Sequence, residues 1–378
     1  MKKLLFIFGT RPEAIKMIPI IKELENSKKF SFEICITAQH REMLDQVLDL
    51  FNIKANYDLN IMKANQDLFD VTTNILIKLK DVLKQSKPDI VLVHGDTTTT
   101  FSASLASFYM KIPVGHVEAG LRTNNIYSPF PEEANRQLTS RLATFHFAPT
   151  KKSYENLLSE GIEKENIFVT GNTVIDTLLI TQKNINSSTK IQYRLSNKIK
   201  ELGYNIEKNK KIVLVTGHRR ENFGNGFINI CKALKTIALN NKDIDIVYPL
   251  HLNPNVQEVV HKYLDDIENI YLITPLDYEP FVYMMSQSYM ILTDSGGIQE
   301  EAPSLGKPIL VMRDTTERPE AVESGTVKLV GTDEELIVKL TQELLDSKTI
   351  YQSMARVENP YGDGTSAKQI ISKLMKIL

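Results

Sequence analysis

Residues 4–16 read LLFIFGTRPEAIK, five apolar residues followed by a Gly-Thr turn and the start of an amphipathic stretch. A short apolar run bounded by turn residues is typical of a buried strand in a parallel sheet. Pro12 suits the first turn of a helix, because the N–H that it lacks would have no partner there anyway. The stretch therefore predicts a strand, a tight turn and a helix, which together open a βαβ unit.

The alternation of short apolar runs and longer amphipathic stretches continues along the chain. One set of apolar runs comprises residues 4–8, 32–37, 90–94, 113–117 and 145–148. A second set comprises residues 211–215, 244–249, 270–274, 290–293 and 308–312. Strands that alternate with helical patterns are typical of parallel sheets. We therefore predict an α/β fold with two Rossmann-like, doubly wound parallel-sheet domains.

The boundary between the two domains is expected near residue 172. The apolar pattern lapses at residues 183–197, where Asn, Ser, Thr and Lys dominate, as is typical near a crossing between domains. We predict an N-terminal domain at 1–172 and a C-terminal domain at 173–363. Residues 364–378 predict a terminal helix, with the N-terminal domain as its expected packing partner.

The length and composition agree with this organisation. At about 150 residues per domain, 378 residues predict two Rossmann-sized domains or one large domain. The chain is 42% hydrophobic and 24% charged, as is usual for a globular protein. Its 45 Lys and Arg against 46 Asp and Glu give a formal charge of −1, so no global field attracts nucleic acid or an anionic membrane. We expect neither as a partner, and any polyanion site must be local.

The cysteines and the N-terminus indicate a cytoplasmic protein. Cys35 and Cys231 are the only cysteines and lack CxxC spacing, which predicts two buried thiols and no thiolate metal site. The apolar run at 4–8 is too short for the core of a signal peptide. No stretch approaches the roughly 18 uninterrupted apolar residues of a membrane span.

Polar motifs follow five of the predicted strands. In an open parallel sheet, ligands bind beyond the carboxyl ends of the strands. The motifs at these ends are GTRPEAIK at 9–16, HGDT at 94–97, EAGLR at 118–122, GHRREN at 217–222 and DSGGIQEE at 294–301. Each alone reads equally well as a solvated loop, but five together favour a binding and catalytic site in the cleft between the two domains.

Two of these motifs suit phosphate. In residues 9–16, Pro12 at the first helical position would leave backbone N–H groups, Arg11 and Lys16 near a helix N-terminus. In Ser295-Gly296-Gly297, small residues let an anion approach the backbone while the hydroxyl caps the helix. A simple N-cap with a tight turn is the alternative for both motifs.

Common cofactor motifs are missing from the sequence. No strand runs into GxGxxG and no GxxxxGK[ST] occurs, so neither a nicotinamide enzyme nor a P-loop ATPase is expected. The seven histidines form no HExxH pair, which argues against a metal site. His116 and His146 lie in apolar runs and are interpreted as hydrogen-bonded core histidines. We expect no cofactor and no metal.

The titratable side chains that remain at the strand ends are candidates for proton transfer. They are Asp96, Glu118, Glu132, Glu133 and His218. Carboxylates that share a site can have pKa values pushed apart, which supplies an acid and a base. Helix capping or compensation of the helix dipole is the alternative for Asp96 and Glu132, and a solvated basic turn is the alternative for His218.

Over nearly its whole length the chain closely resembles the non-hydrolysing UDP-N-acetylglucosamine 2-epimerases. The stretches that carry the resemblance are GTRPEAIKM at 9–17, TAQHR at 37–41, HGDTT at 94–98, HVEAGLR at 116–122, PEEANR at 131–136, TGHRREN at 216–222 and the run from 293 to 322. The resemblance implies a glycosyltransferase-B architecture and a homodimer. It also implies reversible conversion of UDP-GlcNAc to UDP-ManNAc, through elimination of UDP to 2-acetamidoglucal and re-addition, to supply ManNAc for surface polysaccharide.

The resemblance also implies roles for individual residues. Those that match substrate-contacting positions are Arg11, Lys16, Asp96, Glu118, His218, Phe281, Ser295, Gly296, Gly297, Glu301 and Arg318. Those that match catalytic positions are Asp96, Glu118, Glu132 and His218. Gln39 and His40 match part of a region where some bacterial relatives bind a second UDP-GlcNAc as an activator.

Three other functions remain as alternatives. A hydrolysing epimerase would release UDP and free ManNAc, because water intercepts the intermediate. A retaining glycosyltransferase of the same architecture would need an acceptor groove. A nucleotide-sugar sensor would need only the phosphate and base contacts, so the presence of four catalytic-type residues speaks against it.

Overall fold

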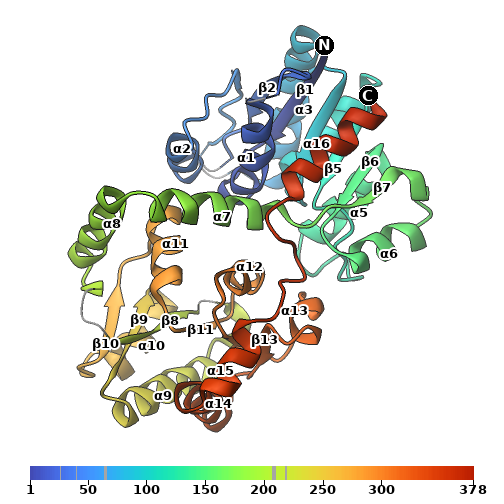
Figure 1. Cartoon of the computed structure of the whole chain (residues 1–378). Coiled ribbons are helices and arrows are strands. Elements are labelled where there is room, and N and C mark those ends of the chain that lie inside the picture. The colour runs from blue at the N-terminus through green and yellow to red at the C-terminus, as the bar shows by residue number, and fades with distance from the viewer. Residues whose placement is uncertain (26, 40, 64–65, 207–209, 218) are drawn as a thin grey trace. The chain divides into compact units, whose positions relative to one another are not determined.

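The computed structural model describes residues 1–25, 27–39, 41–63, 66–206, 210–217 and 219–378 (Figure 1). The chain divides into two compact units. The N-terminal unit comprises Met1–Thr177 and Tyr361–Leu378, and the C-terminal unit comprises Leu178–Pro360. Each unit is a parallel sheet covered by helices, which confirms the predicted α/β class.

The described part of the N-terminal unit holds seven parallel strands in the order β3-β2-β1-β4-β5-β6-β7. They are β1 (Lys2–Phe8), β2 (Phe30–Ile36), β3 (Tyr57–Asp58), β4 (Ile90–His94), β5 (Val114–Val117), β6 (Phe145–Ala148) and β7 (Ile167–Val169). The helices are α1 (Arg11–Glu25), α2 (Arg41–Leu50), α3 (Leu68–Ser86), α4 (Thr98–Tyr109), α5 (Glu132–Leu142), α6 (Lys151–Ser159) and α16 (Ser366–Ile377). α7 (Thr173–Asn186) begins in this unit and ends in the other.

The described part of the C-terminal unit holds six parallel strands in the order β10-β9-β8-β11-β12-β13. They are β8 (Lys211–Thr216), β9 (Ile244–Pro249), β10 (Ile270–Ile273), β11 (Met290–Thr293), β12 (Ile309–Val311) and β13 (Val327–Leu329). The helices are α8 (Thr189–Glu201), α9 (Asn225–Asn240), α10 (Pro254–Leu264), α11 (Tyr278–Gln287), α12 (Gly296–Glu301), α13 (Pro319–Glu323), α14 (Glu334–Asp346) and α15 (Lys348–Ala355).

The central strands are buried on both faces, as helices on both sides of a sheet require. Every residue from Leu4 to Phe8 is fully buried, and so are Ile90 to Val93. These continuous apolar runs are the ones that predicted strands, and all ten predicted strands are confirmed to within two residues at either end. β3, β7 and β13 were not predicted, because runs of two or three residues carry no periodic signal.

The polar stretch at 183–197 is largely helical, although its apolar pattern did not predict a helix there. It forms the end of α7 and most of α8. Ser188 caps α8 by accepting a hydrogen bond from the N–H of Ile191, and Leu195 and Ile199 are buried beneath it. Two apolar anchors on one face are enough to hold a helix that is otherwise solvated.

The last segment of the chain packs on the N-terminal unit. α16 lies beside α1 (Figure 1). The buried carboxylate of Asp176 accepts hydrogen bonds from the N–H groups of Ser366 at 3.3 Å and Ala367 at 2.8 Å. Because these N–H groups begin α16, the carboxylate satisfies donors that the helix leaves without partners.

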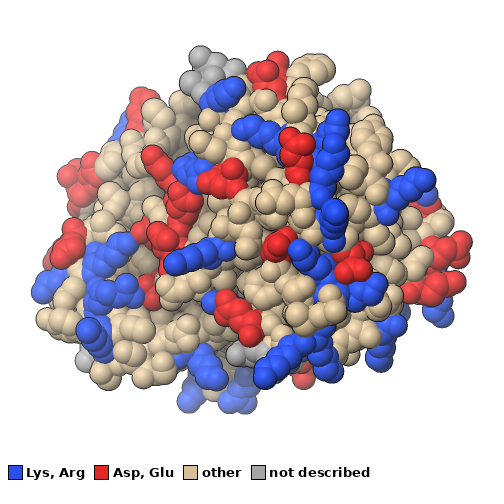
Figure 2. Space-filling view, turned by 90° about the horizontal axis from the view of Figure 1, so that it is seen from above, with Lys and Arg blue, Asp and Glu red and all other residues tan. Residues whose placement is uncertain are grey.

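Positive and negative side chains are interspersed on the face of the molecule drawn in Figure 2. Figure 2 shows Lys and Arg alternating with Asp and Glu, with no continuous field of one sign on this face. Within the described residues, no helix is both long and apolar enough to cross a membrane.

Gly120 sets the backbone just after β5. Its φ is +93°, and a Cβ at this position would lie 2.2 Å from the carbonyl oxygen of Ser153 in α6. The Gly120 carbonyl in turn accepts a hydrogen bond from Asn156 at 2.9 Å. Only glycine fits this close approach between the strand end and α6.

We expect Gly120→Ala to lower Tm by about 8 °C, since the steric clash adds about 2 kcal/mol to the roughly 1 kcal/mol cost of a left-handed alanine. Gly161→Ala is the matched control, because Gly161 also has a positive φ (+82°) but no described atom within 4 Å of an added Cβ. Scanning calorimetry of both variants tests this. Equal melting temperatures for the two would contradict the argument.

Candidate functional site

The polar motifs gather at one sheet edge in each unit. In the N-terminal unit, β1 pairs with β4 and β4 with β5, so the motifs that begin at Gly9, His94 and Glu118 lie at neighbouring strand ends. In the C-terminal unit, β8 pairs with β11 with Thr216 opposite Thr293. The motifs that follow these two strands are therefore neighbours as well.

Glu118 is at the centre of the N-terminal group. It follows β5 with a φ of +63°, a left-handed conformation that is uncommon outside glycine. Its side chain is 8% exposed, and its Oε2 accepts hydrogen bonds from the Lys16 ammonium and from Asn172 Nδ2, the latter at 2.9 Å. Oε1 accepts no hydrogen bond from the residues that the structure describes. One carboxylate oxygen is therefore held by the protein, and the other is available to a ligand.

The charge of Glu118 is set by its neighbours. Burial acts to raise the pKa of this carboxyl, but the Lys16 ammonium and the His94 ring outweigh burial and hold the pKa well below its ordinary value. His94 Nε2 lies 3.7 Å from Oε2, which is longer than a hydrogen bond. At neutral pH Glu118 is therefore a carboxylate, and it is a weak base while Lys16 remains beside it.

Asp96 lies just after β4 and is held by α5. Its Oδ2 accepts a hydrogen bond from the Arg136 guanidinium, and its carbonyl accepts one from Asn135 Nδ2 at 3.0 Å. The capping alternative for Asp96 is wrong, because Thr97 is the N-cap of α4 and accepts a hydrogen bond from the N–H of Thr100 at 3.1 Å. The Asp96 carboxylate therefore belongs to the group at the sheet edge.

The two adjacent carboxylates that begin α5 have different surroundings. Glu133 is fully buried and accepts hydrogen bonds from the N–H groups of Thr123 at 3.0 Å and Asn124 at 3.2 Å. Burial acts to raise its pKa, but the hydrogen bond from Gln137 and these backbone donors lower it. Glu133 therefore fixes the loop before α5. Glu132, the first residue of α5, is half-buried, and its position agrees with compensation of the helix dipole.

The turn after β1 is filled by a carboxylate of the protein itself. Glu13 is 1% exposed, and its Oε2 accepts hydrogen bonds from the N–H groups of Gly9 at 3.0 Å and Thr10 at 2.8 Å. The prediction that the backbone amides of this turn are left for phosphate is wrong for these two. Glu13 Oε1 accepts hydrogen bonds from the hydroxyls of Thr97 at 2.7 Å and Thr100 at 3.2 Å, which links the starts of α1 and α4.

The other predicted residues of this unit lie nearby or outside the described residues. Arg11 is the first residue of α1 and is half-buried, whereas the Lys16 side chain is 14% exposed. Gln39 follows β2, and its Oε1 accepts a 3.4 Å hydrogen bond from Thr99. His40, the second predicted activator contact, lies outside the described residues.

In the C-terminal unit the loop after β8 is held from two sides. Asp294 is fully buried, and its Oδ2 accepts a hydrogen bond from the N–H of Arg219 at 2.7 Å. The hydroxyl of Tyr248 donates to the carbonyl of Gly217 at 2.6 Å. His218 lies outside the described residues, so both interpretations of it remain predictions.

The start of α12 is flanked by two guanidinium groups. A Cβ on Gly296 would lie 3.8 Å from Arg318 Cζ and 3.9 Å from Arg219 Nη2. Small residues beside two cations leave room for an anion. Ser295 is the N-cap by position but makes no side-chain capping bond, so the prediction that its hydroxyl caps the helix is wrong. Arg219 was not predicted as a site residue, although the GHRREN motif contains it.

Carboxylates orient the cations around this helix start. The Arg318 Nε donates to Glu300, which is 1% exposed. Arg313 is 4% exposed and donates to Glu221 at 2.5 Å and to Glu317 at 3.2 Å. Burial acts to raise the pKa of Glu317, but the hydrogen bond and charge of Arg313 outweigh burial and lower it. The segment that carries Arg318 is therefore fixed by ion pairs.

Phe281 and Glu301 complete the predicted set in this unit. Phe281 is half-buried on α11, which packs against β8. Glu301 is the last residue of α12, and its Oε1 lies 3.8 Å from the position that a Cβ would take on Gly297.

Two histidines and both cysteines are structural, as predicted. His116 Nε2 lies 2.7 Å from the Gly95 carbonyl. Burial lowers the pKa of His116 to about 3 and that of His146 to about 4, so both rings are neutral at pH 7. Cys35 and Cys231 are buried thiols. Within the described part of the chain, no group of three or more His, Cys, Asp or Glu residues is arranged to hold a metal ion.

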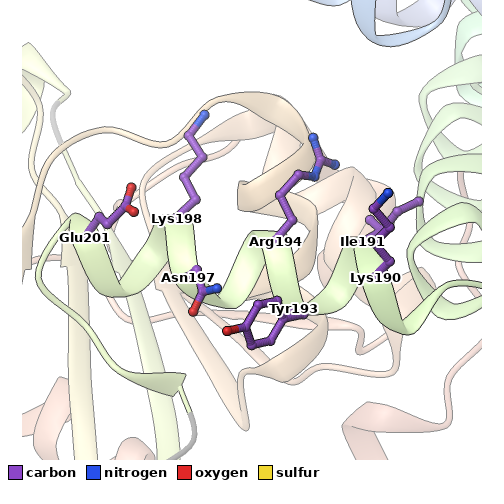
Figure 3. A pocket seen from close by; sticks show the side chains of 7 residues that line it. All are labelled: Lys190, Ile191, Tyr193, Arg194, Asn197, Lys198 and Glu201. Atoms are coloured by element: carbon purple, nitrogen blue, oxygen red, sulfur yellow. The ribbon is translucent and has the colours of Figure 1, made fainter.

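A hollow of about 660 Å³ lies along α8, away from the strand-end motifs (Figure 3). Its lining includes Arg194 and Lys198, which project to the same side of the helix. Arg194 pairs with Glu279 and Lys198 with Asp277, both at 2.6 Å. Because none of the strand-end motifs contributes to its lining, we do not assign the nucleotide to this hollow.

The chain is similar to known proteins over nearly its whole length. The sequence model of a family described as UDP-N-acetylglucosamine 2-epimerase matches residues 22–375. A UDP-N-acetylglucosamine 2-epimerase of Campylobacter jejuni is 60% identical, with 99% of this chain and 98% of that protein covered. A crystal structure of the Neisseria meningitidis UDP-GlcNAc 2-epimerase bound to UDP-GlcNAc is 56% identical with a TM-score of 0.90, covering 99% of this chain and 100% of that one. A Methanocaldococcus jannaschii UDP-GlcNAc 2-epimerase, in complex with UDP-GlcNAc and UDP, is 34% identical with a TM-score of 0.80, covering 99% of each chain.

Lys16→Met and Glu118→Gln each break a buried ion pair, so we expect each to cost about 3 kcal/mol of unfolding free energy at pH 7. The double variant should cost less than the sum of the two, because it leaves no buried charge without its partner. Because the folded-state pKa of Glu118 is lowered, its contribution is fully present above the ordinary value of 4.5 and is lost as the pH falls below it. Urea unfolding at pH 7 and pH 4 measures both effects, and strictly additive costs would contradict the pairing.

Proposed function

The chain belongs to the UDP-N-acetylglucosamine 2-epimerase family, and from this premise we propose how its residues invert C2 of the sugar. The substrates are UDP-N-acetylglucosamine and UDP-N-acetylmannosamine, and no metal or nicotinamide takes part. The observation that carries the proposal is the set of carboxylates and cations at the two sheet edges, within a fold that matches epimerases throughout.

The chemical difficulty lies in the C2–H bond. C2 of a hexose is not next to a carbonyl, so no ordinary base at pH 7 removes its proton directly. As the C1–O bond to UDP lengthens, C1 gains oxocarbenium character and the proton on C2 becomes far more acidic. The diphosphate gains negative charge at the same time, so the reaction needs a base on the sugar and cations on the phosphate.

The proposed reaction is an elimination followed by a re-addition. A base takes the C2 proton, the electrons of that bond form the C1–C2 double bond, and the C1–O electron pair leaves with UDP. The product of this step is 2-acetamidoglucal. UDP then re-adds at C1 while C2 is protonated on the opposite face, which gives the epimer.

We assign the diphosphate to the cations and the helix start of the C-terminal unit, assisted by Arg11, Lys16 and His218. Arg318 and Arg219 flank Gly296, and Ser295 is not engaged in capping. Preorganised contacts of this kind are each worth roughly 2–4 kcal/mol to a developing anion. Gly297, Phe281 and Glu301 are assigned to the rest of the nucleotide.

We assign the two proton-transfer faces to Asp96, Glu118 and Glu132 of the N-terminal unit. An acid or base in position contributes about 10²–10⁴-fold. Support comes from the different surroundings of these groups, because Glu118 and Asp96 are each held by a cation, whereas Glu132 sits at a helix start. Inversion at C2 needs two such groups with different environments.

We further propose a cytoplasmic enzyme that supplies ManNAc units for surface polysaccharide. Two buried thiols support a reducing compartment. A second UDP-GlcNAc, bound near Gln39, is proposed as an activator.

A homodimer is proposed through the outer face of α3, α4 and α5, which pack side by side. Its exposed apolar residues are Phe69, Ile77, Phe108, Tyr109 and Leu138, at 82%, 65%, 56%, 69% and 49% exposure. α4 carries no charged residue over its whole length. Near a twofold axis each residue faces its own copy, so a charge-free helix avoids self-repulsion there. The three aromatic rings alone expose on the order of 400 Å², about half of what each partner in a stable dimer buries.

Incubation with UDP-GlcNAc in D₂O, without added metal or NAD, tests the reaction by proton NMR. We expect UDP-ManNAc with deuterium at C2 and no free sugar, because the C2 proton exchanges with solvent during elimination. Stoichiometric UDP with free ManNAc would indicate a hydrolysing epimerase instead. Tight binding without any change would indicate a sensor or a transferase.

Phe108→Asp should convert the dimer to a monomer, because it places like charges against each other at the proposed interface. Tyr193→Asp on α8 is the matched control, since Tyr193 is 67% exposed and lies in the other unit. Sedimentation equilibrium of the wild type and both variants measures this. A monomeric wild type, or a Phe108→Asp variant that remains dimeric, would overturn the proposal.

A further inference from the structure

His94 is a buried histidine that the proposed mechanism does not use. It is the last residue of β4 and is 3% exposed. Neither ring nitrogen has a hydrogen-bond partner among the described residues. His116 on the next strand differs, because its Nε2 lies 2.7 Å from the Gly95 carbonyl. Buried polar groups are almost always hydrogen-bonded, and a ring with both nitrogens unpartnered among the described residues therefore requires an explanation.

The ring is aimed at the candidate active site. His94 Nε2 lies 3.7 Å from Oε2 of Glu118, the same oxygen that binds Lys16 and Asn172. A shift of about 0.8 Å would bring the two atoms to the usual hydrogen-bond distance. The backbone of His94 is held in place, because the Thr100 hydroxyl donates a hydrogen bond to the His94 carbonyl. The His94 ring is therefore a potential hydrogen-bond donor that lies beside Glu118 Oε2 while Lys16 and Asn172 occupy that oxygen.

Lys16 has two competing tasks under the proposed function. It pairs with Glu118 in this structure, yet it is assigned to the diphosphate of the substrate. A diphosphate carries more negative charge than one carboxylate, and the flexible four-carbon stem of lysine lets its ammonium swing between them. When Lys16 turns to the phosphate, the buried Glu118 oxygen loses its cation. A buried carboxylate that loses one partner needs another.

We propose that His94 is the positioning residue that takes over Oε2 of Glu118 when Lys16 turns to the diphosphate of a bound nucleotide sugar. The inference rests on the proposed function and deepens it. His94 replaces the lost hydrogen bond, so Glu118 stays in place, and because the Lys16 charge has moved away Glu118 becomes a stronger base only once the substrate is bound. Phosphate binding in this way prepares the carboxylate that faces the sugar.

Three substitutions test the proposal. His94→Gln keeps an amide donor near the position of Nε2, His94→Asn keeps an amide one methylene shorter that cannot reach Glu118, and His94→Leu keeps the bulk alone. We expect kcat to fall about 10²-fold in His94→Asn and His94→Leu, with KM within about twofold of wild type. His94→Gln should stay within about fivefold of the wild-type kcat.

The melting temperatures of the variants distinguish a positioning role of His94 from a purely structural one. Because neither ring nitrogen has a hydrogen-bond partner among the described residues, His94→Leu should melt no lower than the wild type, which a structural histidine would not allow. A kcat within twofold of wild type in His94→Asn would overturn the inference, as would equal losses in His94→Asn and His94→Gln. A wild type that does not epimerise UDP-GlcNAc would instead reject the proposed function, so the two failures are distinguishable.

Discussion

The ion pair between Lys16 and Glu118 is the interaction on which the N-terminal site depends. It joins the first helix to the end of β5 across 102 residues of sequence, and both side chains are largely buried. A buried pair is costly to form and more costly to break, so the surroundings must hold both partners in place. Asn172 donates to the same oxygen, and Gly120 lets the chain turn sharply after Glu118. The left-handed φ of Glu118 is maintained by these contacts.

The carboxylates at the sheet edge differ in whether backbone N–H groups are among their hydrogen-bond donors. Glu13 and Glu133 accept hydrogen bonds from backbone N–H groups, which fixes a turn and a loop. Among the described residues, the carboxylates of Glu118 and Asp96 accept hydrogen bonds from side chains alone, including those of Lys16 and Arg136. A carboxylate bound by backbone amides cannot be released without breaking the fold locally. A carboxylate bound by a flexible cation can change partner during a reaction.

The sequence was sufficient to predict the helices and strands that a local pattern of apolar residues indicates. Continuous apolar runs such as 4–8 and 90–93 located the central strands, because a strand buried on both faces has no polar side. The polar helix α8 and the two-residue strand β3 were not predicted from the sequence, because tertiary contacts rather than a local pattern stabilise them.

Among the site residues, strand-end motifs correctly grouped Asp96 with Glu118. That Glu13 occupies the turn amides could not be predicted, because the spacing of a motif does not say which acceptor its N–H groups meet. His94 and Arg219 lay inside quoted motifs, but their roles depend on distances across strands.

At both sheet edges the cations are already paired with carboxylates: Lys16 with Glu118, and Arg318 with Glu300. Under the proposed function, an incoming diphosphate competes with these carboxylates for the two cations, which weakens ground-state binding but keeps each cation oriented beforehand. As the C1–O bond breaks, the charge on the phosphate grows and the competition shifts in its favour, so the attraction is strongest in the transition state, where it accelerates the reaction.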